Sequence, residues 1–222
     1  MPFQTLRRCD LTIESPAFRD YAVFPIFDSA MSEDKRRDAT GCVVGGMSVT
    51  MDMPIVFAEE IHEAPARRNL RIMEIMRRVR AATGYRKLWV EGDEDMLHSL
   101  QSTFKENGEA DPVKGFIIEK LSPGGRNKHA RIEEQDNYME RLSVGPEAEL
   151  YAKRMLEWSR TSGTPDHLPD AGAYFCETAK PGLDKSAKWD KWRTPPKDSM
   201  ALRVWKAQRQ KHSTEQPVPT GW

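Results

Sequence analysis

The stretch Tyr21–Asp28 (YAVFPIFD) is an apolar run that stops at an acid. Such a run predicts a buried β-strand over Tyr21–Phe27, with Asp28 at its end. Pro25 lies inside the run, and proline removes a hydrogen-bond donor from a sheet, so it favours an edge strand or a bulge at that point. The stretch therefore predicts the first strand of a sheet and places one carboxylate at its carboxyl end.

Two further strands follow this first one along the chain. They are predicted over Thr40–Met51 (TGCVVGGMSVTM) and Pro54–Ile61 (PIVFAEEI), with a tight connection around Asp52. Gly45 and Gly46 either weaken the first of these strands or mark a bulge or a close approach of other atoms. Three consecutive strands with short links indicate an antiparallel meander.

Beyond residue 61 the pattern alternates between helix and strand. Apolar residues recur at helical spacing before Gly84, and Gly84 is a typical helix stop. The expected elements are a helix with the apolar face Leu70, Met73, Met76 and Val79, a strand over Lys87–Val90, a helix over Asp93–Glu106, a strand over Val113–Leu121, and three helices: Lys128–Leu142, one beginning at Pro146 with the apolar face Leu150, Tyr151, Met155 and Trp158, and Leu168–Glu177.

This order predicts an α/β domain, a mixed sheet flanked by helices. The domain is expected to cover residues 17–178, after a leader or linker over residues 1–16. A basic tail rich in tryptophan and proline is expected over residues 179–222. Four of the six tryptophans lie in that tail, where they favour stacking or docking to a partner unless they fold back over the domain.

Composition narrows the class of protein. The 34 basic and 34 acidic residues balance, but residues 180–222 carry ten Lys/Arg against four Asp/Glu, which leaves the rest of the chain acidic. An acidic body with a basic tail suits a protein that meets a polyanion or an acidic partner. Three widely spaced cysteines, no zinc-type spacing, no long apolar run and no signal peptide together predict a soluble intracellular protein that does not enter a membrane.

Acids at strand ends are the candidates for chemistry. Asp28 ends the first predicted strand, Glu91 ends the fourth, and Asp170 opens the final helix. If the first and fourth strands are neighbours, the three carboxylates can converge. Carboxylates are the ligands that Mg²⁺ and Mn²⁺ prefer, and two such ions about 4 Å apart can hydrolyse a phosphodiester. Placement alone, however, favours ordinary solvated acids at any one strand end.

Four stretches carry a resemblance to a known family. They are FDSA at 27–30, LWVEGD at 88–93, NKHARIE at 127–133 and PDHLPDAGAYF at 165–175. Their order and spacing resemble the C-terminal nuclease domain of the large terminase subunit of tailed bacteriophages, a member of the RNase H-like superfamily. The resemblance covers about residues 17–178, and the last stretch is the most specific part of it.

The resemblance implies a set of site residues. Asp28, Glu91 and Asp170 match the catalytic, metal-binding acids, which would hold two Mg²⁺ or Mn²⁺ ions. His167 matches a position that serves as an additional metal ligand in some members. The interpretation of His167 from the residues alone is a helix cap or a solvated side chain.

Two basic residues also match the family. The resemblance assigns Lys128 and Arg131 to the DNA backbone or to orienting the site, although a solvated helix face explains them equally well. Asp166 and Asp93 are weaker candidates, and Asp166 is typical of a helix cap or turn.

The function implied by the resemblance is an endonuclease that cuts concatemeric double-stranded viral DNA during genome packaging, in the cytoplasm of the host. The sequence has no G-x-x-x-x-G-K-[ST] phosphate loop, so the packaging ATPase would reside on a separate chain or in a missing domain. The tail would meet the portal, the small terminase subunit or the capsid. The alternatives are another RNase H-like nuclease, such as a junction resolvase, and a non-catalytic docking module for the packaging motor.

Overall fold

Seven strands form one mixed sheet in the computed structural model, which describes residues 6–29, 39–111, 113–122, 127–159 and 165–179. The strands lie in the order β1-β7-β4-β3-β2-β5-β6. Their bounds are β1 Arg7–Arg8, β2 Ala22–Ser29, β3 Thr40–Met47, β4 Met53–Ile61, β5 Lys87–Glu91, β6 Ile117–Lys120 and β7 Leu142–Glu147. The helices are α1 Pro65–Thr83, α2 Glu94–Glu106, α3 Lys128–Glu133, α4 Glu149–Glu157 and α5 His167–Ala179, with 3₁₀ turns at Pro16–Asp20 and Glu134–Tyr138.

The predicted meander is confirmed, and so is the α/β class. β2, β3 and β4 pair antiparallel, β5 pairs parallel with β2, and β6 pairs parallel with β5. On the other side of the sheet, β7 pairs parallel with β4 and β1 pairs parallel with β7. β2 is thus an inner strand, and its pairing with β5 begins at Ile26, one residue beyond Pro25.

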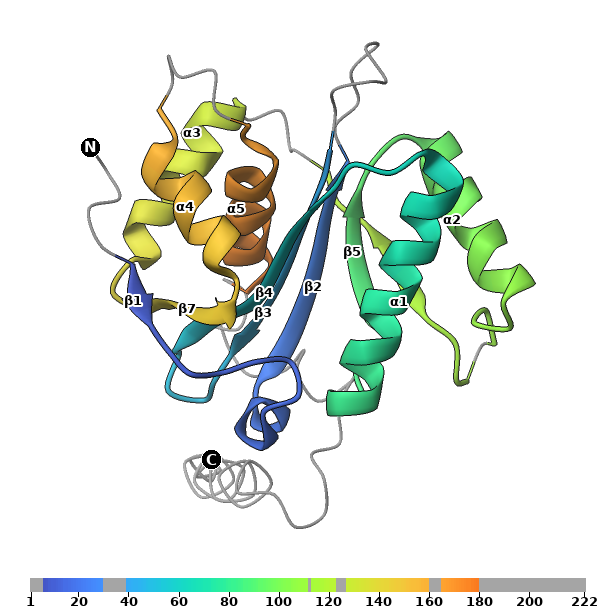
Figure 1. Ribbon diagram of the computed structural model, residues 1–222, viewed down its shortest axis with the longest axis horizontal. Coiled ribbons are helices and arrows are strands. Elements are labelled where there is room, and N and C mark those ends of the chain that lie inside the picture. Colours follow the sequence, from blue (N-terminus) through green and yellow to red (C-terminus); the bar gives the residue numbers. More distant parts are fainter. Residues whose placement is uncertain (1–5, 30–38, 112, 123–126, 160–164, 180–222) are drawn as a thin grey trace, which may run out of the picture.

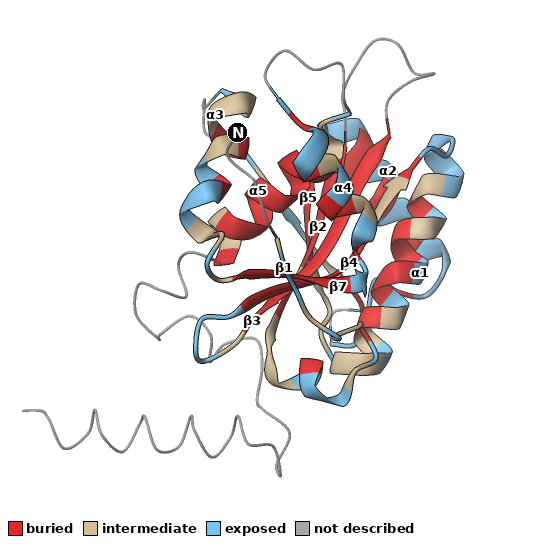
Figure 2. Cartoon of the chain, turned by 60° about the vertical axis from the view of Figure 1, so that its left-hand side comes forward, coloured by how far each residue is buried: buried red, intermediate tan, exposed pale blue. Residues whose placement is uncertain are grey.

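Helices cover both faces of the sheet. α1 and α2 pack on one face, and α3, α4 and α5 pack on the other (Figure 1). Neighbouring residues of one strand point to opposite faces, so Ile26 enters the core under α4 and α5 while Phe27 enters the core under α1 and α2. Figure 2 shows that the central strands are buried along most of their length.

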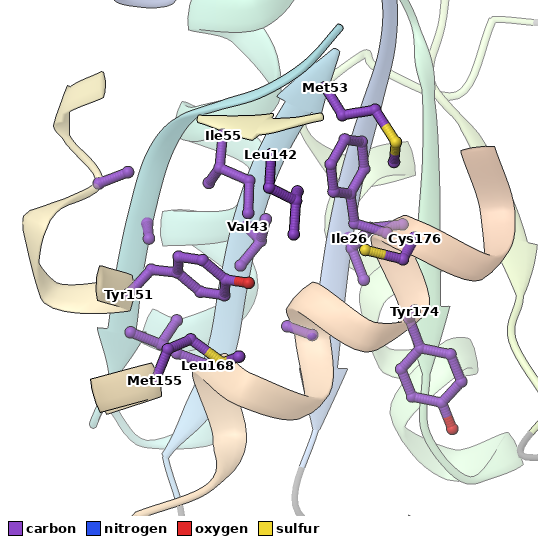
Figure 3. Packing of buried hydrophobic residues seen from close by; sticks show 14 of the residues in the cluster. Ile26, Val43, Met53, Ile55, Leu142, Tyr151, Met155, Leu168, Tyr174 and Cys176 are labelled. Atoms are coloured by element: carbon purple, nitrogen blue, oxygen red, sulfur yellow. The ribbon is translucent and has the colours of Figure 1, made fainter. Parts of the chain in front are cut away.

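The core under α4 and α5 supports the helix that carries Asp170. Tyr151 and Met155 of α4 lie beside Leu168 of α5 and face Val43 of β3 (Figure 3). On the opposite face, the predicted apolar residues Met73, Met76 and Val79 of α1 are buried, whereas Leu70 is exposed and Asn69 takes the inner position. The helix predicted over Asp93–Glu106 is confirmed as α2, whose apolar residues Met96, Leu97, Leu100 and Phe104 are buried.

Gly45 and Gly46 mark both a bulge and close approaches, as one of the two interpretations predicted. The register between β3 and β4 shifts between Val44 and Gly45. A Cβ atom at Gly45 would lie 2.6 Å from the ring of Phe175 in α5, and one at Gly46 would lie 2.6 Å from the ring of Phe18. Because Gly45 and Gly46 have no side chains, α5 and the first 3₁₀ turn can pack closely against the sheet.

The helix predicted over Lys128–Leu142 was wrong in its end, and the helix predicted from Pro146 was wrong in its start, although its apolar residues Tyr151, Met155 and Trp158 are buried as predicted. α3 ends at Glu133, and Leu142–Glu147 forms strand β7. Pro146 is tolerated there because β1 pairs only with Ser143 and Val144, and because the ladder to β4 is irregular between Val144 and Glu147. The helix after it begins at Glu149, and β6 is shorter than the predicted Val113–Leu121.

The start of the chain contributes to the domain. Arg7 and Arg8 extend the sheet, and Ile13 is fully buried, although residues 1–16 were predicted as a leader or linker. The basic tail over residues 179–222 lies, beyond Ala179, outside the described residues. None of the described helices is long and apolar enough to cross a membrane.

Candidate metal centre

Asp28 and Glu91 lie side by side at the carboxyl ends of two parallel strands. The pairing of β2 with β5 runs through Ile26–Trp89 and Phe27–Val90 and ends at Asp28–Glu91. The first and fourth predicted strands are therefore neighbours. Residues that face each other across such a pair project their side chains to the same face of the sheet.

Asp170 completes the cluster from the helical layer. It lies in the first turn of α5, which packs on β2 and β3. Asp28, Glu91 and Asp170 each place one carboxylate oxygen within 4.8 Å of the others. Within the described ranges, no other His, Cys, Asp or Glu side chains form such a group of three or more.

Gly41 of β3 allows α5 to begin so close to the sheet. It is the residue paired with Asp28 across β2 and β3. A Cβ atom at this position would lie 2.4 Å from the carbonyl oxygen of His167, which is far inside van der Waals contact. Because the obstacle is backbone, any side chain at residue 41 would push the start of α5, and Asp170 with it, away from Asp28.

The cluster is buried and incompletely satisfied. Asp28 is 3% exposed, and its Oδ2 has no hydrogen-bond partner, which is also true of Oε2 of Glu91. Burial, followed by the nearby Asp170 and Glu91 carboxyl groups, raises the pKa of Asp28 well above its ordinary value of 3.8. Since unpaired buried oxygens are costly, this donor set suits a hard divalent cation such as Mg²⁺ or Mn²⁺.

Asp170, in contrast, is held by two cations. Arg131 donates from Nε and Nη2 to the two carboxylate oxygens, both at 2.8 Å. Lys128 Nζ lies 3.5 Å from Asp170 Oδ2. Burial still raises the pKa of Asp170, against the opposing effect of Lys128 and Arg131. A bidentate arginine fixes the plane of a carboxylate, so Asp170 is oriented before any ion arrives.

Tyr174 is a residue of the site that the sequence did not indicate. Its ring lies beneath the guanidinium of Arg131, 4.2 Å from it. Its hydroxyl is buried without hydrogen-bonding geometry to any group, and burial, then the nearby Glu91 carboxylate, raises its pKa. The available signal was the helical spacing of four residues from Asp170, which places Tyr174 one turn along the same face of α5.

The other predicted residues lie around this centre. His167 is the first residue of α5 and is not among the three side chains that gather there. Asp166 accepts the backbone hydrogen bond of Asp170, as a helix N-cap does, and its carboxylate lies 3.0 Å from Lys128 Nζ. Asp93 caps α2, because its side chain accepts a hydrogen bond from Met96 N at 2.7 Å.

The two basic residues differ in exposure. Arg131 is 3% exposed, and its Nε and Nη2 both donate to Asp170, which favours an orienting role over a contact with DNA. The side chain of Lys128 is 36% exposed, so it lies at the rim of the centre, between the acids and solvent.

Comparison with solved structures assigns the architecture. The human cytomegalovirus terminase nuclease domain superposes with a TM-score of 0.55 at 14% identity, over 79% of this chain and 90% of that one. The chain has an RNase H-like fold. No family model and no curated protein matches this sequence.

Two further chains superpose on this RNase H-like fold less closely. RuvC of T. thermophilus, solved with a Holliday junction substrate, matches with a TM-score of 0.41 at 15% identity, over 75% of this chain and 99% of that one. The yeast mitochondrial Holliday junction resolvase Ydc2 matches with a TM-score of 0.43 at 10% identity, over 89% of this chain and 86% of that one.

Proposed function

We propose that this protein is a divalent-metal-dependent endonuclease that cleaves double-stranded viral DNA during genome packaging. The observation that carries the proposal is the buried group Asp28, Glu91 and Asp170, with two carboxylate oxygens left without partners. Its position on an RNase H-like fold that superposes on a terminase nuclease domain supports the same activity. The motif order described above supports the more specific role of a phage-type terminase nuclease.

Each residue of the centre has a distinct part in this proposal. Asp28, Glu91 and Asp170 hold the cation, and Arg131 keeps the Asp170 carboxylate in one orientation. Mg²⁺ or Mn²⁺ bound there would activate the attacking water and stabilise the leaving oxygen of the phosphodiester. His167, three residues before Asp170, is a candidate for a further ligand. A site of this kind would act on the phosphate backbone and not on base edges, so the enzyme would read little sequence by itself.

Two features of the sequence suggest partners for the proposed nuclease: the missing phosphate-binding loop and the basic tail. Because the sequence has no phosphate-binding loop, a packaging ATPase must come from another chain or domain. The basic, tryptophan-rich tail would dock to that motor or to the portal, the small terminase subunit or the capsid.

Cleavage of plasmid DNA tests the activity. The parent protein should nick and linearise supercoiled plasmid with Mn²⁺ or Mg²⁺ and should stop when a chelator is added. Asp28→Asn and Asp170→Asn should lose activity by about 10²–10³-fold or more, since each removes charge that stabilises the transition state. Asp52→Asn is a matched control, because Asp52 is exposed in the turn at the opposite end of the sheet.

Three outcomes would redirect the proposal. Variants that cut as fast as the parent would show that the acids are not the catalytic group. A strong preference for a four-way junction over linear duplex would favour a resolvase. Packaging that survives neutralisation of all three acids, but is lost when the tail is removed, would favour a docking module.

A further inference from the structure

Lys128 is the cationic residue that touches the acidic centre from the solvent side. It is the first residue of α3, and its Nζ lies 3.0 Å from Asp166 Oδ1 and 3.5 Å from Asp170 Oδ2. The Asp28 carboxylate is also close enough to interact with it electrostatically. A lysine on an ordinary solvated helix face would have no reason to meet three carboxylates from two separate segments, β2 and the start of α5.

The charges of the described side chains around this lysine leave a negative excess. The carboxylates in or beside the centre are Asp28, Glu91, Asp166 and Asp170, and the cations in contact with them are Lys128 and Arg131. Four negative charges against two positive ones leave a deficit of two positive charges. One divalent ion supplies that deficit, whereas a second would bind to a neutral centre beside an ammonium group.

The two cations are not equivalent. Arg131 is buried and engages both oxygens of Asp170, so it is a fixed part of the frame. Lys128 reaches Asp170 on the oxygen that also receives Arg131 Nη2, and it remains partly exposed at the rim. An ammonium group is a compact point charge with three donors, which suits it to the position that a second metal ion would otherwise take.

We propose that Lys128 takes the place of a second metal ion, so that the DNA-free protein binds one divalent cation rather than two. The inference rests on the proposed metal-dependent nuclease and sharpens it. The expectation of two ions, which came from the family resemblance, is thereby replaced by one ion plus a lysine. Asp166 is the positioning residue for that lysine, because it makes the shortest contact with Nζ.

Titration of the full-length, DNA-free protein with Mn²⁺ alone tests this proposal. Isothermal calorimetry should give one ion per chain for the parent. Lys128→Met, which keeps the length of the side chain but removes its charge, should bind two ions, with the affinity for the second increased at least about tenfold because a neighbouring positive charge is gone. The spin coupling between two adjacent Mn²⁺ ions should then appear in the paramagnetic resonance spectrum.

Two matched variants separate charge from structure. Lys128→Arg keeps the positive charge and should still bind one ion. Lys114→Met removes an exposed lysine from the loop before β6, outside the centre, and should also leave one ion bound. Circular dichroism and thermal melting of each variant establish that the fold is kept.

The outcomes are distinct for the two proposals. Two ions bound by the parent, or a single ion bound by both the parent and Lys128→Met, would overturn the role of Lys128 and leave the nuclease proposal standing. The titration of the parent alone can give the first of these results, even if Lys128→Met fails to fold. A parent protein that binds no Mn²⁺ would overturn both.

Discussion

Asp28 and Glu60 are two buried carboxylates that lie on either side of Gly41. They differ in whether an arginine hydrogen-bonds to them. Both pair with Gly41, Asp28 from β2 and Glu60 from β4. The Glu60 side chain is 4% exposed, and its two oxygens each accept a hydrogen bond of 2.8 Å from Arg154 of α4. Asp28 is equally buried, but no arginine or lysine hydrogen-bonds to it within the described part of the chain.

The difference teaches how to tell a structural acid from a functional one. Glu60 has its own bidentate arginine and belongs to no group of three possible metal ligands among the described residues, so removing one partner would leave the other uncompensated. Asp170 also has a bidentate arginine, but it lies within the three-acid group. A buried carboxylate that lacks such a partner costs folding free energy unless a ligand supplies the charge. Burial alone does not distinguish Asp28 from Glu60, whereas the state of their oxygen atoms does.

The largest effects on the free energy of unfolding are expected when each of the two acids is neutralised in the absence of metal. Glu60→Gln should lower the free energy of unfolding by about 2 kcal/mol, because Arg154 loses its charged partner but keeps some contact with water. Asp28→Asn should raise it, since a neutral amide costs less to bury than a carboxylate and is not repelled by Asp170 and Glu91. Chemical denaturation in the presence of a chelator measures both.

Opposite signs for these two variants would support the distinction. Equal losses of stability would mean that Asp28, like Glu60, is part of the permanent frame. Glu60→Gln should also retain plasmid cleavage below its melting temperature, because Glu60 is not among the three acids that gather at the centre.

A second test addresses the glycine between the two acids. Gly41→Ala should cost about 2 kcal/mol of stability, because its Cβ meets the carbonyl oxygen of His167 and the start of α5 must shift. Metal affinity should fall along with stability, since the shift separates Asp170 from Asp28. Gly84→Ala is a poor control because Gly84 has positive φ, whereas an exposed substitution such as Ser102→Ala in α2 tests the effect of a mutation remote from the centre.

If Gly41→Ala loses stability but binds Mn²⁺ as tightly as the parent, the position of α5 is not what brings Asp170 to the cluster. Calorimetric titration at a temperature where both proteins are folded gives this answer.

The smallest expected effect is the pH dependence of the metal-free protein. The pKa of Asp28 in the folded state lies above its ordinary value of 3.8, so the folded state holds a proton that the unfolded state releases. Stability should therefore fall as the pH rises above about 4, and it should level off once the pH exceeds the folded-state pKa. Asp28→Asn should lack this part of the decline when both proteins are unfolded at about pH 4 and at about pH 7.5. If the free energy of unfolding changes equally for the two proteins between these pH values, this expectation is contradicted.

The parts of the fold that the sequence predicted are those where a pattern is local. The meander and the apolar faces of α1 and α2 follow from periodicity within one segment. β7 could not be predicted in this way, because Gly145 and Pro146 interrupt it and its partners β1 and β4 are remote in sequence. Pro146 favours a helix start when only its neighbours are considered, and the bulge that accommodates it is a tertiary feature.

The sequence also predicted the acids of the site but not the contacts around them. Strand ends pointed to Asp28 and Glu91, and the motif at residues 165–175 pointed to Asp170. The pairing of Arg131 with Asp170 could not be predicted, because the exposure of Arg131 depends on how α3 packs against α5. Tyr174 was missed for the same reason, since its ring lies against the guanidinium of Arg131.

The place of Asp170 in α5 has a consequence during synthesis. The chain is synthesised from its N-terminus, so Asp28 and Glu91 leave the ribosome before Asp170. The third carboxylate, the arginine that orients it and the helix that seats it over Gly41 come from residues 127–179, after most of the sheet has been made. A nascent chain therefore cannot bring the three carboxylates together until its last described helix docks on the sheet.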